Sequence, residues 1–264
     1  MIIKEIIQSI EKSVPRAYAE EWDNVGLLIG DENETVNGVL IALELTEAVL
    51  QEAIDGGFNL IITHHPLIFS GIKKINYQDL TGRIIRKVIA NNIAVYAAHT
   101  NLDNAPNGVN HMLAKKIGLV ETTILSPREW ENTAEQIGSG VIGTLPEPMD
   151  EQDFLCKVKQ ILNIPVLRHS GFLGKPIKKV ALCGGSGSFL IHSVLEQNAD
   201  VFITADVKYH DFFTPDKKLL LVDAGHYETE QFTTSLLLDI LHQNFSNFAA
   251  RISCLSTNAV NYLI

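Results

Sequence analysis

The hydrophobic pattern of the first half alternates between short apolar runs and segments with helical spacing. Apolar runs at Val39–Leu43, Leu60–Thr63 and Ile93–Ala98 are typical of buried strands, and a helix capped by Thr46 and another at Gly82–Asn92 lie between them. This alternation predicts a largely parallel sheet with helices on its faces. The remaining pattern predicts helices at 2–12, 107–117, 150–162, 189–197 and 230–242. It predicts a turn leading into a strand at 22–30, and further strands at 180–183, 200–204, 219–223 and 248–255.

The strand–helix–strand pattern occurs twice. The same spacing separates Val39 from Thr63 and Val180 from Thr204, and both second strands end in a similar apolar run closed by threonine. We interpret this as a weak internal repeat, with chance similarity of two such units as the alternative. The residues that follow differ, because His64-His65 in the first copy corresponds to Ala205-Asp206 in the second.

Composition and charge limit the class of protein. The 264 residues are 46% hydrophobic and 20% charged, as in a globular protein, and the formal net charge is −10. An acidic total disfavours broad binding to nucleic acid or acidic membranes, and no apolar run is long enough to span a bilayer. The N-terminus has no signal-peptide pattern. Cys156, Cys183 and Cys254 form no CxxC pair, so we expect small core residues in a reduced cytoplasm.

Potential metal ligands follow three of the apolar runs. His64 and His65 end one strand, His99 and Asp103 follow the next, and His226 and Glu230 follow the strand at 219–223. Imidazole and carboxylate together suit Zn, Mn, Fe or Ni, and α/β proteins place their chemistry at strand ends. The pattern therefore predicts a metal centre assembled from distant parts of the chain.

Each of these groups also has a structural interpretation. His64 and His65 could simply cap a buried strand and bind nothing. However, Pro66 forces a turn there, which favours side chains that diverge toward two ions. Asp103 could be a turn or cap residue, and His99 could hold a ligand in place or relay a proton.

His226 and Glu230 have i, i+4 spacing, which places both on one helix face. Alternatively, Glu228 and Glu230 could simply stabilise the positive start of a helix.

Two further segments are ambiguous. The glycine-rich run 184–188 could cradle a phosphate or could be an ordinary tight turn, and it is not a P-loop. The polar segment 204–210 could face a substrate or could be a surface loop.

The motifs together resemble the GTP cyclohydrolase I type 2 family, also called the Nif-three-like family. The resemblance rests on Ile-Ile-Thr-His-His-Pro-Leu, on His-Thr-Asn-Leu-Asp and on Asp-Ala-Gly-His-Tyr-Glu-Thr-Glu. Trp-Asp-Asn-Val-Gly-Leu near the start, Cys-Gly-Gly-Ser-Gly and Thr-Ala-Asp-Val-Lys-Tyr-His also fit in order. At this length the chain resembles the family's short form, which lacks an inserted domain.

The resemblance implies an α/β protein of two interlinked, similar halves with mixed, mostly parallel sheets flanked by helices. We expect residues 1–125 with 221–264 to form the half that carries the ligands, and 126–220 to form the other. It also implies two divalent metal ions, of Zn, Mn or Fe, with Mg²⁺ less favoured by so many histidines. The implied ligands are His64, His65, Asp103, His226 and Glu230, with Glu230 as the bridge.

Two positions depart from the family pattern. Glu44 stands where the family often has Asp, and Glu228 stands where some relatives carry His. Both changes could alter the pocket beside the metals.

Two ions would acidify a water between them, so the expected reaction class is metal-assisted hydrolysis, with His99 or Glu44 as the proton relay. The family name suggests GTP as the substrate, and other nucleotides or small molecules would suit the same centre.

The competing interpretation is a non-enzymatic metal-binding ring with a regulatory or DNA-related role. The resemblance further implies a homohexameric ring. A charged lumen could thread nucleic acid, although no basic stripe is evident in the sequence.

Overall fold

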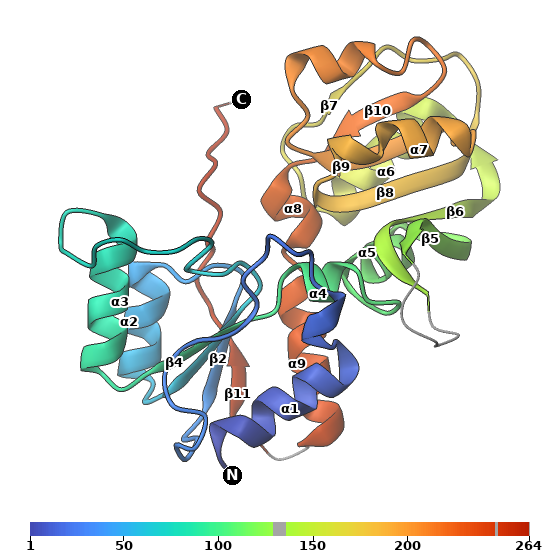
Figure 1. Ribbon diagram of the computed structural model, residues 1–264. Coiled ribbons are helices and arrows are strands. Elements are labelled where there is room, and N and C mark those ends of the chain that lie inside the picture. The colour runs from blue at the N-terminus through green and yellow to red at the C-terminus, as the bar shows by residue number, and fades with distance from the viewer. Residues whose placement is uncertain (129–135, 246–247, 264) are drawn as a thin grey trace. The chain divides into compact units, whose positions relative to one another are not determined.

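The structure is a computed structural model, and it describes residues 1–128, 136–245 and 248–263. The chain forms two compact units, drawn in Figure 1. Unit 1 consists of Met1–Leu102 and Thr233–Ala259, and unit 2 consists of Asp103–Phe232 and Val260–Ile264. Each unit contains one mixed sheet flanked by helices, so the predicted α/β class is confirmed.

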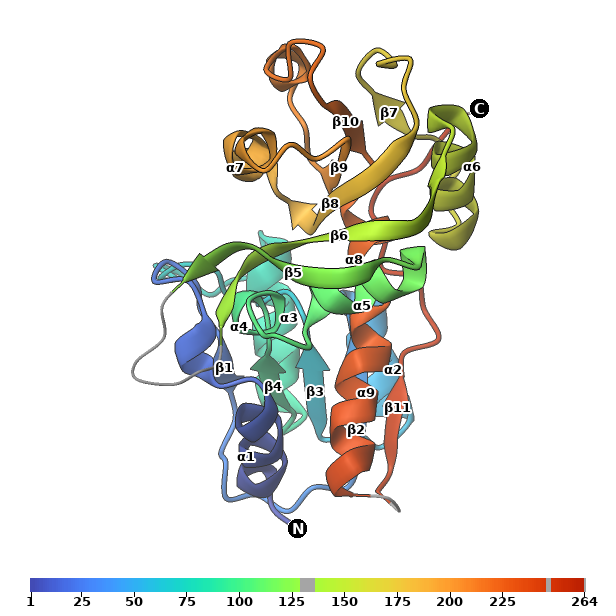
Figure 2. The same cartoon turned by 90° about the vertical axis from the view of Figure 1, so that its right-hand side faces the viewer.

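Unit 1 is built on a five-stranded sheet in the order β1-β4-β3-β2-β11. The neighbours β4, β3, β2 and β11 are parallel, and β1 pairs antiparallel with β4. Helices α2 and α3 cover one face, and α1 and α9 lie side by side on the other (Figures 1 and 2). The bounds are α1 Ile3–Ser13, η1 Arg16–Tyr18, β1 Gly26–Ile29, β2 Val39–Ala42, α2 Glu47–Asp55, β3 Leu60–Thr63, α3 Leu80–Ala90, β4 Ala94–Ala97, α4 Thr100–Asp103, α9 Thr233–Asn244 and β11 Ala250–Ile252.

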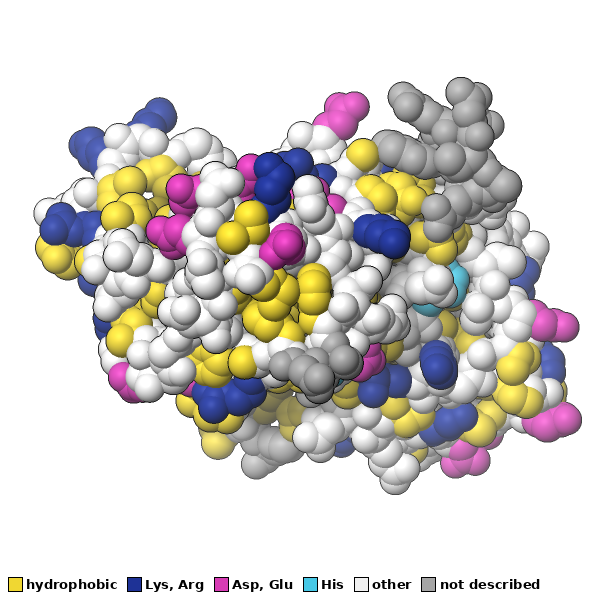
Figure 3. All heavy atoms as spheres, turned by 90° about the horizontal axis from the view of Figure 1, so that it is seen from below, with side chains coloured by type: hydrophobic (Ala, Val, Ile, Leu, Met, Phe, Trp, Pro, Cys, Tyr) yellow, Lys and Arg dark blue, Asp and Glu magenta, His cyan; other side chains and the backbone are white. Residues whose placement is uncertain are grey.

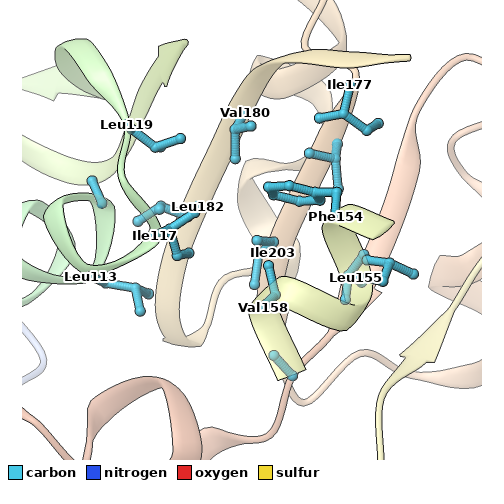
Figure 4. Close-up of a cluster of buried hydrophobic side chains, with 14 of the residues drawn as sticks. Leu113, Ile117, Leu119, Phe154, Leu155, Val158, Ile177, Val180, Leu182 and Ile203 are labelled. Atoms are coloured by element: carbon cyan, nitrogen blue, oxygen red, sulfur yellow. The ribbon is translucent and has the colours of Figure 1, made fainter. Parts of the chain in front are cut away.

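Unit 2 is built on a six-stranded sheet in the order β5-β6-β8-β9-β10-β7, of which β8, β9 and β10 are parallel. Alternate residues face opposite sides. Val180, Leu182 and Ile203 pack against α5 and α6, as Figure 4 shows, whereas Ala181 and Phe202 pack against α7. The bounds are α5 Val109–Ile117, β5 Val120–Arg128, β6 Ile137–Met149, α6 Glu151–Ile161, β7 Arg168–His169, β8 Ile177–Ser186, η2 Ser188–Leu190, α7 Ile191–Glu196, β9 Val201–Ala205, η3 Tyr209–Phe213, β10 Leu220–Asp223 and α8 His226–Glu230.

The repeated strand–helix–strand pattern has a structural counterpart in each unit. β2 pairs parallel with β3 with Val39 opposite Leu60, and β8 pairs parallel with β9 with Val180 opposite Val201. The paired residues are equally far apart along the chain in both copies. The two sheets therefore share one building unit, as the sequence predicted.

Several elements differ in detail from the prediction. The single helix expected at 230–242 is two helices, since α8 ends at Glu230 and α9 begins at Thr233. The glycine run does not end its strand, because β8 continues to Ser186. Of the cysteines expected in the core, only Cys183 is buried, whereas Cys156 and Cys254 are exposed.

The units also divide at other places than the expected boundaries. Segments 103–125 and 221–232 were expected with the first half, but they belong to unit 2. The reason is strand pairing, which the hydrophobic pattern along the sequence does not reveal: β5 pairs with β6, and β10 pairs with β9 and β7.

Within the described part of the chain, no helix has the length and apolar character needed to cross a bilayer.

Candidate metal centre

Three imidazoles converge at the strand ends of unit 1. His64 and His65 directly follow β3, and His99 follows the parallel neighbour β4. One ring nitrogen of each lies within 4.8 Å of the others, and the ring centroids are 4.8 to 5.3 Å apart. Because parallel neighbours end at the same sheet edge, residues far apart in sequence meet there. Such a group of side chains can hold a metal ion.

Hydrogen bonds orient each of these three rings. The Nδ1 atom lies 2.8 Å from the Ala98 carbonyl oxygen in His64, 3.1 Å from Glu44 Oε1 in His65, and 2.9 Å from Asp23 Oδ1 in His99. A carbonyl or carboxylate oxygen only accepts, so each neutral ring must carry its proton on Nδ1. Each Nε2 then presents a lone pair, which is the arrangement of metal-ligating histidines.

The Asp23 carboxylate, which orients His99, is itself held by several hydrogen bonds. Burial raises the pKa of Asp23, but hydrogen bonds from His99 and Thr100 outweigh it and lower the pKa to about 2. Its Oδ2 accepts from the Thr100 amide and hydroxyl as well. Asp23 therefore stays ionised and fixes the His99 ring. The sequence had given it no role, although it lies in the Trp-Asp-Asn motif used for the resemblance.

The two carboxylate oxygens of Glu44 have different surroundings, because Oε1 accepts the hydrogen bond from His65 and Oε2 does not take part in it. Its Oε2 is buried and has no hydrogen-bond partner among the described residues. A buried carboxylate oxygen without a partner is costly, and a cation or a shared proton would offset that cost. The donor set of unit 1 thus fits a bound divalent metal.

Unit 2 contributes a second group on α8. His226 Nε2 lies 3.1 Å from Glu230 Oε2, one helical turn away, as their spacing predicted. The His226 Nδ1 lies 2.6 Å from Asp206 Oδ2, so this ring is also oriented by a carboxylate. The His226 side chain is 39% exposed and Glu230 only 3%. Asp206, which the sequence analysis named in the second copy of the repeat and within a polar segment, thus positions a candidate ligand.

The glycine run of β8 makes room for Glu230. Gly185 has φ +60°, and a Cβ on it would lie 2.2 Å from Glu230 Oε1. The Gly184 amide donates to Asn110 Oδ1 and the Gly185 amide to Thr229 Oγ1. Because these N–H groups already have acceptors, close approach of the backbone to a carboxylate explains the run better than a phosphate cradle.

Asp103 also belongs to unit 2. It is partly buried, and its carbonyl accepts from Asn110 Nδ2 at 3.1 Å. Burial raises the pKa of the Cys183 thiol, and the negative charges of Asp103 and Glu230 raise it further. Both carboxylates therefore lie in the electrostatic reach of one buried side chain of β8. An expected ligand pair is thus close together within this unit.

The candidate residues divide between the two units. His64, His65, His99 and Glu44 come together in unit 1, and Asp103, His226 and Glu230 lie in unit 2. His99 was expected as a proton relay, and its nitrogen lies among those of the expected ligands. Imidazole and carboxylate donors in these numbers suit Zn, Mn or Fe.

Comparison with known proteins gives relatives over most of the chain. A protein of Clostridium perfringens named GTP cyclohydrolase 1 type 2 homolog is 36% identical over 233 residues, which is 87% of each chain. The protein of that name from Clostridium acetobutylicum is 35% identical over 231 residues, covering 86% of this chain and 85% of its own. The Staphylococcus aureus (strain MRSA252) homolog aligns over 369 positions with full coverage of both chains at 29% identity. An alignment of that length includes positions that this chain of 264 residues lacks.

Solved structures of related proteins have the same fold as this chain. The Bacillus cereus protein related to NIF3 superposes with a TM-score of 0.92 at 29% identity, covering 100% of this chain and 99% of its own. Staphylococcus aureus protein SA1388 gives a TM-score of 0.90 at 34% identity, with the same coverage. The profile of the Duf34/NIF3 (NGG1p interacting factor 3) family matches residues 1–259. The chain therefore belongs to the Duf34/NIF3 family, as its motifs predicted.

Proposed function

We propose that this chain binds two divalent metal ions and is a metal-dependent hydrolase that acts on a nucleotide or a related small molecule. The proposed ligands are His64, His65, Asp103, His226 and Glu230. One observation carries the proposal: these three histidines, and His99 with them, each have Nδ1 against an acceptor. In the three histidines of unit 1 this orientation directs the Nε2 lone pair toward a metal, and in His226 Nε2 lies beside the proposed ligand Glu230 at 3.1 Å.

The chemistry follows from the donor set. When bound, a pair of divalent ions supplies Lewis acidity that lowers the pKa of water toward neutrality and polarises a substrate oxygen. His99 can accept a proton at Nε2, and the ionised Asp23 on its Nδ1 stabilises the imidazolium that results. Glu44 can hold a proton on Oε2, since that oxygen is buried and has no partner among the described residues.

GTP is the first substrate to test, because the relatives carry the name GTP cyclohydrolase 1 type 2 homolog. The protein, reloaded with Zn, Mn or Fe, is assayed on GTP, other nucleotides and phosphodiesters, with metal content measured in parallel. We expect about two ions per chain and metal-dependent turnover. His65→Ala should lose metal and turnover, whereas His169→Ala, an exposed histidine of β7, should lose neither.

The same assay separates two roles for His99. If His99→Ala loses metal, the residue is a ligand. If it keeps metal and loses turnover, it is the proton relay. Well under one ion per chain in the reloaded protein contradicts the metal proposal.

A second candidate function is a metal-binding ring that acts through a partner. The family description, NGG1p interacting factor 3, names an interaction and no reaction. Metal binding without turnover of any compound would favour this alternative, and light scattering would test the proposed hexamer. On the face drawn in Figure 3, Lys and Arg side chains are interspersed with acidic and apolar ones.

A further inference from the structure

Two exposed aromatic rings flank the imidazole of His99. The Trp22 ring centroid lies 6.1 Å from that of His99 at an interplanar angle of 75°, and Phe69 lies 5.7 Å away at 90°. Both contacts are edge-to-face, a favourable geometry for aromatic pairs. The two rings come from segments far apart in the sequence and meet at one histidine. We call Trp22 and Phe69 the aromatic pair.

Both rings are open to solvent. Trp22 is 65% exposed and Phe69 is 52% exposed. Burying a large aromatic side chain is favourable, so two such rings left in water beside a functional group point to a binding surface. Their exposed faces are therefore available to a ligand.

The backbone beneath the aromatic pair is tied down. The Asp23 carboxylate accepts from the Thr100 amide and hydroxyl and contacts His99, and the Glu20 amide donates to Thr100 Oγ1 at 2.9 Å. Asn24 Nδ2 donates to the Ile68 carbonyl at 2.6 Å, which joins the turn before Phe69 to the turn after Trp22. The rings are thus set in place before a ligand arrives, which lowers the entropy lost on binding.

We propose that Trp22 and Phe69 stack the planar heteroaromatic ring of the substrate beside the histidines of unit 1. The inference rests on the proposed function and adds the substrate class, a compound with a flat, conjugated ring such as a purine. Aromatic side chains bind any such ring through its π-face and give little discrimination among bases. Lys73 and Lys74 are exposed on the segment that follows Phe69.

Fluorescence of Trp22 reports the stacking directly. The sequence has a second tryptophan, Trp130, so the measurement uses the metal-loaded Trp130→Phe protein. Guanosine, adenosine, GTP and ribose 5-phosphate are titrated separately. We expect the three heteroaromatic compounds to quench the emission and ribose 5-phosphate to leave it unchanged.

Substitutions give the second readout. In calorimetry with GTP, Trp22→Ala or Phe69→Ala should each weaken binding by about five- to 150-fold, the range for loss of one stacking ring. Phe172→Ala is the matched control, because Phe172 is also exposed and also contacts a histidine, His169, at 4.8 Å in unit 2. The control should bind GTP normally, and metal content should be unchanged in all three variants.

Two results would overturn the inference. One is unaltered binding of heteroaromatic compounds in both Trp22→Ala and Phe69→Ala. The other is a change in oligomeric state in these variants with ligand binding intact, which would make the surface a contact between copies. Either result leaves the metal proposal standing, because that proposal fails only on metal content or turnover.

Discussion

Replacing Gly185 with alanine should lower metal affinity as well as stability. The added Cβ would lie 2.2 Å from Glu230 Oε1, whereas ordinary contact begins at 3.4 Å, so the oxygen must retreat by 1.2 Å. The nearest atom ends a side chain, so Glu230 can swing away instead of breaking the strand. Metal–ligand distances tolerate only about 0.2 Å, so a displacement of this size removes a ligand.

The expected magnitudes separate two effects of the substitution. The φ of +60° at Gly185 costs an alanine about 1 to 2 kcal/mol of stability whatever its surroundings. Gly174→Ala is the matched control in the same unit, with φ +73° and nothing within 4 Å of its added Cβ. Both variants should therefore lose about 1 to 2 kcal/mol, with about 1 kcal/mol more for Gly185→Ala.

Metal affinity should fall at least about tenfold in Gly185→Ala and stay unchanged in Gly174→Ala. Stability is measured by urea denaturation of the metal-free protein, and affinity by competition with a chelator. Equal metal affinity in the two variants would refute the reasoning, because it would mean that Glu230 does not bind metal or that its position is not controlled by Gly185.

Three further predictions concern other parts of the molecule. Asp206→Asn removes the carboxylate that orients His226, so calorimetry should show metal affinity about 10- to 100-fold weaker with little change in stability. Burial raises the pKa of Asp200, but hydrogen bonds from one lysine ammonium and two backbone amides outweigh it and lower the pKa. The Asp200 carboxylate therefore stabilises the fold at pH values above its ordinary pKa, and this stabilisation is lost as the pH falls through the lowered pKa. The protein should be more stable than Asp200→Asn in urea titrations at neutral pH, and this difference should be smaller at strongly acid pH. Phe154→Ala empties a fully buried position of the cluster in Figure 4 and should cost about 3 to 5 kcal/mol in the same titration, and a loss under about 1 kcal/mol would contradict that packing.

The sequence by itself determined the class of fold and the residue types of the candidate centre. Strands buried in a parallel sheet have continuous apolar sequences, so the strands Leu60–Thr63 and Ala94–Ala97 could be predicted to within a residue or two. The i, i+4 spacing of His226 and Glu230 was also sufficient to predict that their side chains are close, because a single helical turn brings them together.

Only the tertiary structure decided which strands pair and which groups support the ligands. The pairing of β10 with β9 and β7 placed α8 in unit 2, contrary to the expected boundaries. Asp23 and Asp206 orient histidines 76 and 20 residues away along the chain, and neither position carries a local signal of that role. Gly185 likewise looked like a turn residue until Glu230 was seen against it. The physical reason is the same in each case, since local pattern encodes secondary structure, whereas long-range contacts depend on how the strands assemble.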